Sequence, residues 1–185
     1  MSDSLTTKIS LSNSLKKLME TTPFEKITAS MICANCGMNR KSLYYHFKDK
    51  YDLINWIFDT EFPHIEITSF SNSSYEQKKH YMLLLCTYLY ENRDFYRKAF
   101  KIKDQNSLSN HLRELIRNVL TIDLSYLSSD AVKDEFALEI LTDTVFCTIE
   151  RWITASRCMP PDEFIEKLFY WVEFLSESVY KNKPR

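Results

Sequence analysis

Apolar residues recur every three or four positions along most of the chain, which is the spacing of one face of an α-helix. Three stripes show this spacing most clearly: Leu11, Leu15, Leu18 and Met19; Tyr81, Leu84, Leu85, Tyr88 and Leu89; and Leu112, Leu115, Ile116, Val119 and Leu120. No segment alternates apolar and polar residues over the length of a strand. The pattern therefore predicts an all-α protein.

Polar residues and helix breakers divide the N-terminal part into short helices. Thr28 can cap a helix over residues 29–36. Gly37 can end that helix, because glycine enters the left-handed conformation without a Cβ clash. Asn39 can cap the next helix and Asp49 the one after it.

The two helices predicted near the C-terminus, residues 131–159 and 162–181, carry apolar residues on more than one side. Pro160-Pro161 separates them, and the second proline suits a first helical turn. A helix that is apolar on two sides needs a second surface to cover it, and a second copy of the chain can supply that surface. The predicted dimer interface is Ile149, Trp152, Ile153, Phe164, Leu168, Trp171 and Leu175. The alternative is that these helices are central to the core of one chain.

Composition narrows the class of protein. A single glycine in 185 residues disfavours hairpins, tight βα turns and phosphate-binding loops. With 44% hydrophobic and 26% charged residues, the chain has the composition of a globular protein. The longest apolar run, residues 81–86, is too short to span a bilayer, and the first residues lack the apolar core of a signal peptide. We therefore expect a cytoplasmic protein whose five cysteines are reduced.

The net charge of −1 hides an asymmetry along the chain. Residues 1–50 hold eight Lys and Arg against four Asp and Glu, a net charge of +4. The remainder holds 16 against 21, a net charge of −5. A basic N-terminal part on an acidic body suggests that the N-terminal part meets an anionic partner.

The single glycine lies at the start of the most informative stretch, CGMNRKSLYYHFKDK at residues 36–50. Two short helices joined by a tight glycine turn, the second rich in cations, have the layout of a helix-turn-helix. The second helix of this motif lies in the major groove of DNA with its N-terminal residues near base edges. Arg40 and Lys41 occupy those positions, and Arg can pair with guanine. Leu43 and Phe47 should point inward and hold the helix on the domain.

The longer string ITASMICANCGMNRKSLYYHFKDKYDLINWIF, residues 27–58, resembles the DNA-binding domain of the TetR family of bacterial transcription regulators. The family's pattern has Thr at the start of the second helix, a small residue before glycine, and a Leu-Tyr-x-His-Phe core followed by Lys and Leu. The matching residues are Thr28, Cys36, Gly37, Leu43, Tyr44, His46, Phe47, Lys50 and Leu53. The run at residues 44–58 is most similar to the subgroup related to regulators of dihydroxyacetone kinase operons. Two departures are Cys33-Ala34-Asn35-Cys36, where members often carry Ala-Glu-Glu-Ala, and Asn39 in place of a Ser or Thr cap.

The resemblance implies a helix-turn-helix domain over residues 1–50 and a helical ligand-binding and dimerisation domain over residues 51–185. A polar stretch at residues 63–74 predicts a loop at the junction. The implied protein is a homodimer that binds a palindromic double-stranded DNA operator. Thr28, Tyr44 and Lys50 are expected on phosphates, and Arg40, Lys41, Ser42 and Tyr45 in the groove. The full set of predicted DNA-binding residues is Thr28, Asn39, Arg40, Lys41, Ser42, Tyr44, Tyr45, His46, Lys48 and Lys50.

The resemblance also implies that a small-molecule effector or a co-regulator protein changes the spacing of the two DNA-binding heads. The residues expected to line a ligand pocket are Phe58, Phe62, Tyr81, Leu85, Tyr88, Phe100, Phe146 and Glu150. Aromatic residues at helical spacing are also typical of an ordinary core, so that alternative stays open. Glu150-Arg151 is either a polar handle for a ligand or an ion pair at a helix edge.

Two other classes of function compete with a DNA-binding regulator. An enzyme is disfavoured, because the sequence has no Ser-His-Asp order, no phosphate-binding loop and no ligand spacing for a metal, and we expect no cofactor. A module that binds a co-regulator through its terminal helices stays open. Cys33-x-x-Cys36 lacks the second pair that zinc needs, so both residues are interpreted as small core residues. Cys158 lies near a turn, where a thiol sensor is the less favoured interpretation.

Overall fold

The computed structural model describes residues 3–62, 73–127 and 134–181, and this part of the chain is helical throughout, with connecting turns and no strand. The helices are α1 (Asp3–Thr21), the 3-10 helix η1 (Phe24–Lys26), α2 (Ala29–Asn35), α3 (Arg40–His46), α4 (Lys50–Glu61), α6 (Tyr75–Glu91), α7 (Arg93–Ala99), α8 (Leu108–Leu127), α9 (Glu135–Thr154) and α10 (Pro161–Lys181). The predicted all-α fold is confirmed. None of the helices described is long and apolar enough to cross a membrane.

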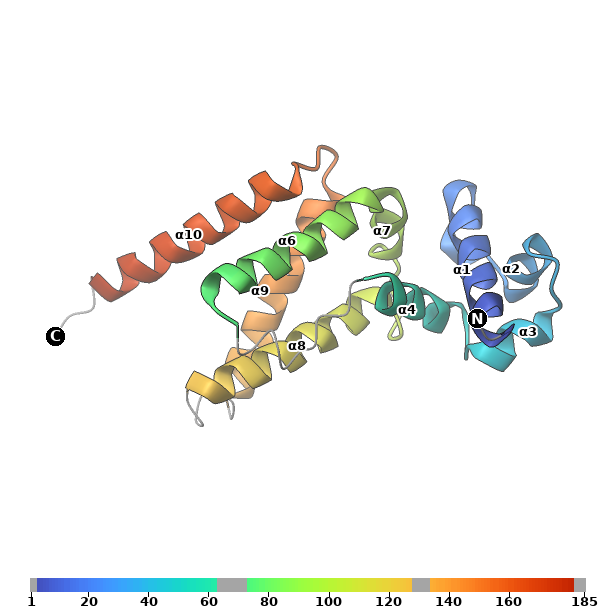
Figure 1. Ribbon diagram of the computed structural model, residues 1–185, viewed down its shortest axis with the longest axis horizontal. Coiled ribbons are helices and arrows are strands. Elements are labelled where there is room, and N and C mark those ends of the chain that lie inside the picture. The colour runs from blue at the N-terminus through green and yellow to red at the C-terminus, as the bar shows by residue number, and fades with distance from the viewer. Residues whose placement is uncertain (1–2, 63–72, 128–133, 182–185) are drawn as a thin grey trace.

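The helices α1, α2 and α3 form a small head at one end of the molecule (Figure 1). Leu11 and Leu15, one turn apart on α1, have no exposed surface and meet Ile32 of α2 and Leu43 of α3 in the core. The hydroxyl of Ser14 donates to the carbonyl of Ile32 across 2.6 Å, which ties α1 to α2 inside this core. The head is therefore held by one apolar stripe of α1, as the spacing of its leucines predicts.

Helix α4 joins the head to the rest of the chain, which we call the body (Figure 1). Leu53, Ile54, Ile57 and Phe58 are all buried, and the helix packs against both α1 and α8. Since one continuous core includes residues of head and body, a domain boundary at residue 50 stays a prediction. The predicted loop at residues 63–74 falls mostly outside the described residues.

In the body, α8 and α9 pack side by side, and α10 runs beside α6 and extends beyond it (Figure 1). Helix α9 is shorter than the predicted 131–159, of which 131–133 lie outside the described residues. It ends at Thr154 because Arg97 donates to the carbonyls of Ile153 and Ala155 at 2.9 and 2.6 Å. Helix α10 begins at Pro161, which confirms the proline at a first helical turn.

The residues of the predicted dimer interface differ in exposure within a single chain. Ile149, Trp152 and Ile153 of α9 are 1%, 6% and 0% exposed within a single chain, and Phe164 stacks on Trp152 with ring centroids 4.6 Å apart. These four side chains therefore belong to the core of one chain, and a contact with a second copy at these positions stays a prediction. Leu168 is half-buried, Trp171 is exposed, and the side chain of Leu175 is outside the described part.

Candidate nucleic-acid interface

Three side-chain caps and one glycine set the geometry of the α2–α3 unit. Thr28 Oγ1 accepts from the backbone N–H of Met31 at 3.2 Å and starts α2, and Asn39 Oδ1 accepts from that of Ser42 at 3.1 Å and starts α3. Asp49 caps α4 in the same way. Between α2 and α3, Gly37 has φ +71°, the left-handed conformation that its lack of a side chain favours. The predicted helix boundaries around this turn are confirmed.

Helix α3 has one buried and one open face. Leu43 is fully buried and Phe47, just after the helix, is 3% exposed, as their spacing predicts. On the opposite side Arg40 and Lys41 are exposed, and Tyr45 is 83% exposed. An aromatic side chain with this much surface in water, between cations, is unusual for a stable fold and suits contact with a ligand.

Arg40 and Tyr44 contact each other one helical turn apart. Arg40 Nη2 donates to the Tyr44 hydroxyl at 3.1 Å, and its guanidinium lies 5.2 Å from the centre of the tyrosine ring. This hydrogen bond raises the pKa of the arginine, which is charged at any physiological pH in either case. The resemblance assigns Arg40 to bases and Tyr44 to phosphate, and this bond leaves the Tyr44 hydroxyl proton and the other guanidinium N–H groups to donate.

Lys50 lies at the first turn of α4 with its ammonium directed toward η1. It donates to the carbonyls of Phe24 and Ile27 at 2.7 and 2.8 Å and lies 4.3 Å from the centre of the Phe24 ring. Partial burial lowers the pKa of this ammonium. Lys50 is thus beside Thr28, at the same edge of the head, and its phosphate contact stays a prediction.

The remaining predicted DNA-binding residues differ in exposure. Lys48 is exposed, and its backbone N–H donates to Asp52 Oδ2 at 2.9 Å. Ser42 is half-buried beside its cap, and His46 is half-buried with its ring 4.8 Å from that of Tyr45. The predicted set thus lies on α3, at the start of α4 and at the start of α2, and its contact with DNA stays a prediction.

Most of the predicted pocket residues form a closed aromatic cluster between α4, α6, α7 and α9. Phe58, Phe100 and Phe146 are 2%, 4% and 0% exposed, and Tyr96 lies between the rings of Phe58 and Phe100. Phe62 and Tyr88 pack on the edge of this cluster. These rings fill the space that a ligand would need, so for Phe58 and Phe146 the ordinary-core alternative describes the structure. Tyr81 and Leu85 are half-buried on α6 and line neither of the two cavities found.

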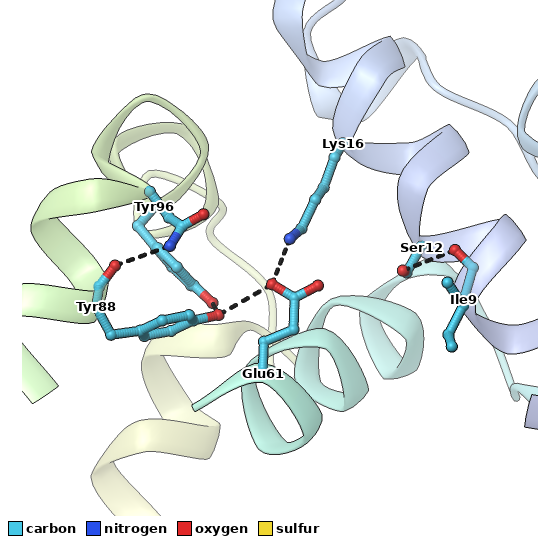
Figure 2. Close-up of polar contacts among 7 residues, drawn as sticks. Ile9, Ser12, Lys16, Glu61, Tyr88 and Tyr96 are labelled. Atoms are coloured by element: carbon cyan, nitrogen blue, oxygen red, sulfur yellow. Dashed lines mark hydrogen bonds and ion pairs between the residues drawn. The ribbon is translucent and has the colours of Figure 1, made fainter. Parts of the chain in front are cut away.

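Polar groups at the edge of the aromatic cluster connect the head to the body (Figure 2). Lys16 of α1 forms an ion pair with Glu61 of α4, whose carboxylate also accepts from the Tyr88 hydroxyl at 3.3 Å. The hydroxyls of Tyr88 and Tyr96 are 2.5 Å apart, and burial raises the pKa of both. On the other side of α1, Lys98 Nζ donates to the carbonyls at its C-terminal end, with 2.6 Å to that of Met19. Sequence reasoning missed these contacts, because nothing in the spacing relates α1 to α6 or α7.

A cavity of about 880 Å³ lies elsewhere in the body, between the α7–α8 loop, α8 and α9. Of the predicted pocket residues, Phe100 and Glu150 line it. The sequence analysis missed the cations on its walls, Lys101, Lys103 and Arg113, although two lysines in one short turn are a signal that could have found them.

Four of the five cysteines are buried or half-buried, and Cys147 is exposed. Cys33 is 1% exposed, and burial raises its pKa and those of Cys36 and Cys158. A raised thiol pKa leaves little thiolate at neutral pH, which disfavours a reactive role. Within the described residues no group of His, Cys, Asp and Glu side chains could hold a metal ion.

Comparison with known proteins defines the class of this chain. A family model described as "Bacterial regulatory proteins, tetR family" matches residues 14–57, and one described as "Transcriptional regulator C-terminal region" matches residues 76–173. The second match alone spans more than half of the 185 residues. The chain belongs to the TetR family of transcriptional regulators.

One curated relative indicates the subgroup of the family to which this chain is similar. The HTH-type dhaKLM operon transcriptional activator DhaS of Lactococcus lactis subsp. lactis (strain IL1403) is 33% identical over 106 residues, which are 57% of this chain and 54% of that protein. The match thus spans about half the length of this relative. These findings confirm the resemblance to the dihydroxyacetone kinase operon subgroup, and they confirm a regulator in place of an enzyme.

Solved structures have the same fold. That of the dihydroxyacetone kinase operon activator DhaS has a TM-score of 0.58 at 21% identity, over 92% of this chain and 98% of that one. That of NalD, the secondary repressor of the MexAB-OprM multidrug efflux pump in Pseudomonas aeruginosa, has a TM-score of 0.61 at 14% identity, over 91% and 97%. The predicted TetR-like architecture, a helix-turn-helix unit followed by a helical body, is thereby confirmed.

Proposed function

We propose that this TetR-family regulator binds a palindromic DNA operator as a homodimer, with α3 of each copy in the major groove. The observation that carries the proposal is the open face of α3, where Arg40, Lys41 and Tyr45 are exposed behind a turn that contains the only glycine of the chain. Cations at the start of a helix suit base edges and phosphates in the major groove. The proposed location is the cytoplasm, where bacterial DNA is accessible.

A second copy is the proposed occupant of the exposed apolar face of α10. Tyr170, Trp171, Val172 and Phe174 are 60%, 55%, 58% and 49% exposed, and the rings of Tyr170, Trp171 and Phe174 contact one another on the outside of the helix. Soluble chains rarely leave such a patch in water. A two-fold pairing of helices would cover it and would place two heads for the two half-sites of a palindrome.

The binding experiment selects bound duplexes from a random library at fixed salt and repeats the selection with Arg40→Ala. We expect an inverted repeat, with one position per half-site relaxed by about 1–3 kcal/mol in the variant. Lys17→Ala, which removes an exposed cation of α1, is the matched control and should leave the preference unchanged. Binding without any sequence preference, or an unchanged preference in Arg40→Ala, would contradict the groove assignment.

The phosphate assignment has a separate test in the salt dependence of affinity. Lys50→Met should weaken binding to all sequences and reduce the slope of log affinity against log salt by about one unit. Because this ammonium also bonds to the carbonyls of Phe24 and Ile27, the unfolding midpoint has to be measured alongside. An unchanged slope in a folded variant would limit Lys50 to its structural contacts.

Dimerisation is tested by mass in solution. Light scattering should give about twice the chain mass of 22.0 kDa, and Trp171→Glu should shift the protein to the monomer. Tyr45→Glu, an equivalent change on α3, should leave the mass unchanged. A monomeric wild-type chain would favour the alternative function, a helical module that acts through a co-regulator protein bound to α10.

We further propose that an effector or a co-regulator changes the affinity for DNA. The contacts of Lys16 with Glu61 and of Lys98 with the end of α1 support this, because they connect the body to the head. The relatives above are described as an activator and as a repressor, so the sign of regulation is not part of the proposal.

A further inference from the structure

The cavity of about 880 Å³ in the body has the size of a small-molecule site. Its walls come from three places: the loop at residues 101–107 between α7 and α8, the first turns of α8, and one face of α9. Its apolar floor includes Phe100 and Ile102, which are 4% and 5% exposed. The cavity adjoins the closed aromatic cluster through Phe100, and a ligand on this floor would contact the cluster from outside.

The walls carry more positive than negative charge. Lys101, Lys103 and Arg151 line the cavity and form no ion pair within the part of the chain that the structure describes. Arg113 is also on the wall, with its Nε 2.9 Å from Asp143 Oδ1 and its guanidinium 3.8 Å from the centre of the Phe146 ring. Three cations are therefore available to a ligand at this site.

Two carboxylates lie on the same walls. Asp104 accepts from the backbone N–H of Asn106 at 2.9 Å, and burial together with the charge of Asp104 raises the pKa of the Tyr51 phenol on α4. Glu150 has no such partner among the described residues, and it balances one of the three cations. The cavity keeps an excess of positive charge over an apolar floor.

We propose that this cavity binds a small amphipathic organic anion, with its carboxylate or phosphate near Lys101, Lys103 and Arg151 and its apolar part on Phe100 and Ile102. The inference rests on the effector response proposed above and adds the chemical class of the effector. A neutral or cationic ligand of the same size would leave the excess positive charge of the walls without a counter-charge.

The loop that lines the cavity also contacts α4, the helix that carries the head. Asn55 Nδ2 of α4 donates to the carbonyl of Asn106 at 3.3 Å, and the charge of Asp104 is close enough to Tyr51 of α4 to contribute, after burial, to the raised pKa of its phenol. The Oδ1 atom of Asn55 is buried without a partner among the described residues, so the contact between the loop and α4 contains an acceptor that lacks a hydrogen bond. An anion drawn toward Lys101 and Lys103 would shift the loop and with it the start of α4.

The test uses the full chain and four probes with one eight-carbon tail: octanoate, octyl phosphate, octanol and octylammonium. Isothermal titration calorimetry should find binding of the two anions and at least tenfold weaker binding of octanol and octylammonium. The double variant Lys103→Gln, Arg151→Gln should weaken anion binding about tenfold, since each partly exposed charge pair contributes modestly. Lys167→Gln, which removes an exposed cation of α10 outside the cavity, should leave it unchanged. Whichever of octanoate and octyl phosphate binds more tightly shows whether the site prefers a carboxylate or a phosphate.

Octanol binding as tightly as octanoate would overturn the proposal, as would anion binding that the double variant leaves intact. Absence of binding by both anions would overturn it as well. Operator affinity, measured with and without the tighter anion, separates the two proposals. Anion binding that depends on Lys103 and Arg151 but leaves operator affinity unchanged would support the site and contradict the effector response.

Discussion

The turn between α2 and α3 depends on the conformation of one residue, and the cost of changing it follows from the structure. Gly37 has φ +71°, and a Cβ built there would meet no atom within 4 Å. A substitution at this position therefore costs backbone strain and no steric clash. An L-residue in the left-handed conformation costs about 1–2 kcal/mol. Replacing glycine by alanine also reduces the entropy of the unfolded chain, which returns about 0.4–1 kcal/mol.

We therefore expect Gly37→Ala to lower the free energy of unfolding by about 1 kcal/mol, and Gly37→Asn by less, because asparagine tolerates the left-handed conformation. Ala34→Gly is the matched control: it makes the reverse change at an exposed position in α2, where glycine is the poorer residue, and should cost about 0.5–1 kcal/mol. Urea unfolding followed by far-UV circular dichroism, at one protein concentration, measures all three. Gly37→Ala as stable as the wild type, or Gly37→Asn less stable than Gly37→Ala, would refute the reasoning.

Three further predictions concern the body. Tyr96→Phe should cost about 1 kcal/mol of unfolding free energy in urea, because the buried hydroxyl bonds to that of Tyr88; no loss would mean that the bond contributes nothing. Lys98→Met should speed amide hydrogen exchange in the last turn of α1, whose carbonyls it frees, and equal exchange rates would contradict this link between body and head. Burial raises the pKa of the Cys86 thiol to about 12, from 9.0 for the unfolded chain. Between pH 9 and 12 the thiol loses its proton in the unfolded chain but keeps it in the folded one, so stability that is fully present below pH 9 is lost over this range. Cys86→Val should therefore flatten the fall of the unfolding midpoint at alkaline pH. An unaltered fall would exclude this thiol as a cause.

Local features of the sequence predicted the head well. Thr28, Asn39 and Asp49 cap the helices that the sequence assigned to them, and Gly37 has the conformation that its position predicts. Such features depend on contacts between residues two to four positions apart, so the sequence contains the information needed. The buried face of α3 was predictable for the same reason.

Predictions that depended on long-range packing fared less well. The apolar residues of α9 suggested a surface shared with a second copy, but Trp152 is covered by Phe164 of the same chain. The sequence analysis places Phe58 and Phe146 around a ligand. In the structure both are buried, with Phe58 against Tyr96 and Phe146 against Phe100 in one core. An apolar residue is equally apolar in a core, a pocket or an interface, so periodicity alone could not distinguish these three.

The sequence by itself determined the all-α class, the helix-turn-helix unit and the family, because periodicity, capping and a short motif are local properties of the chain. Tertiary structure alone decided that Lys50 turns toward the carbonyls of η1, that Lys98 reaches the end of α1, and that Lys101 and Arg151 line one cavity. Residues 101 and 151 are fifty positions apart, and the packing of α7 and α8 against α9 brings their charges to the same surface.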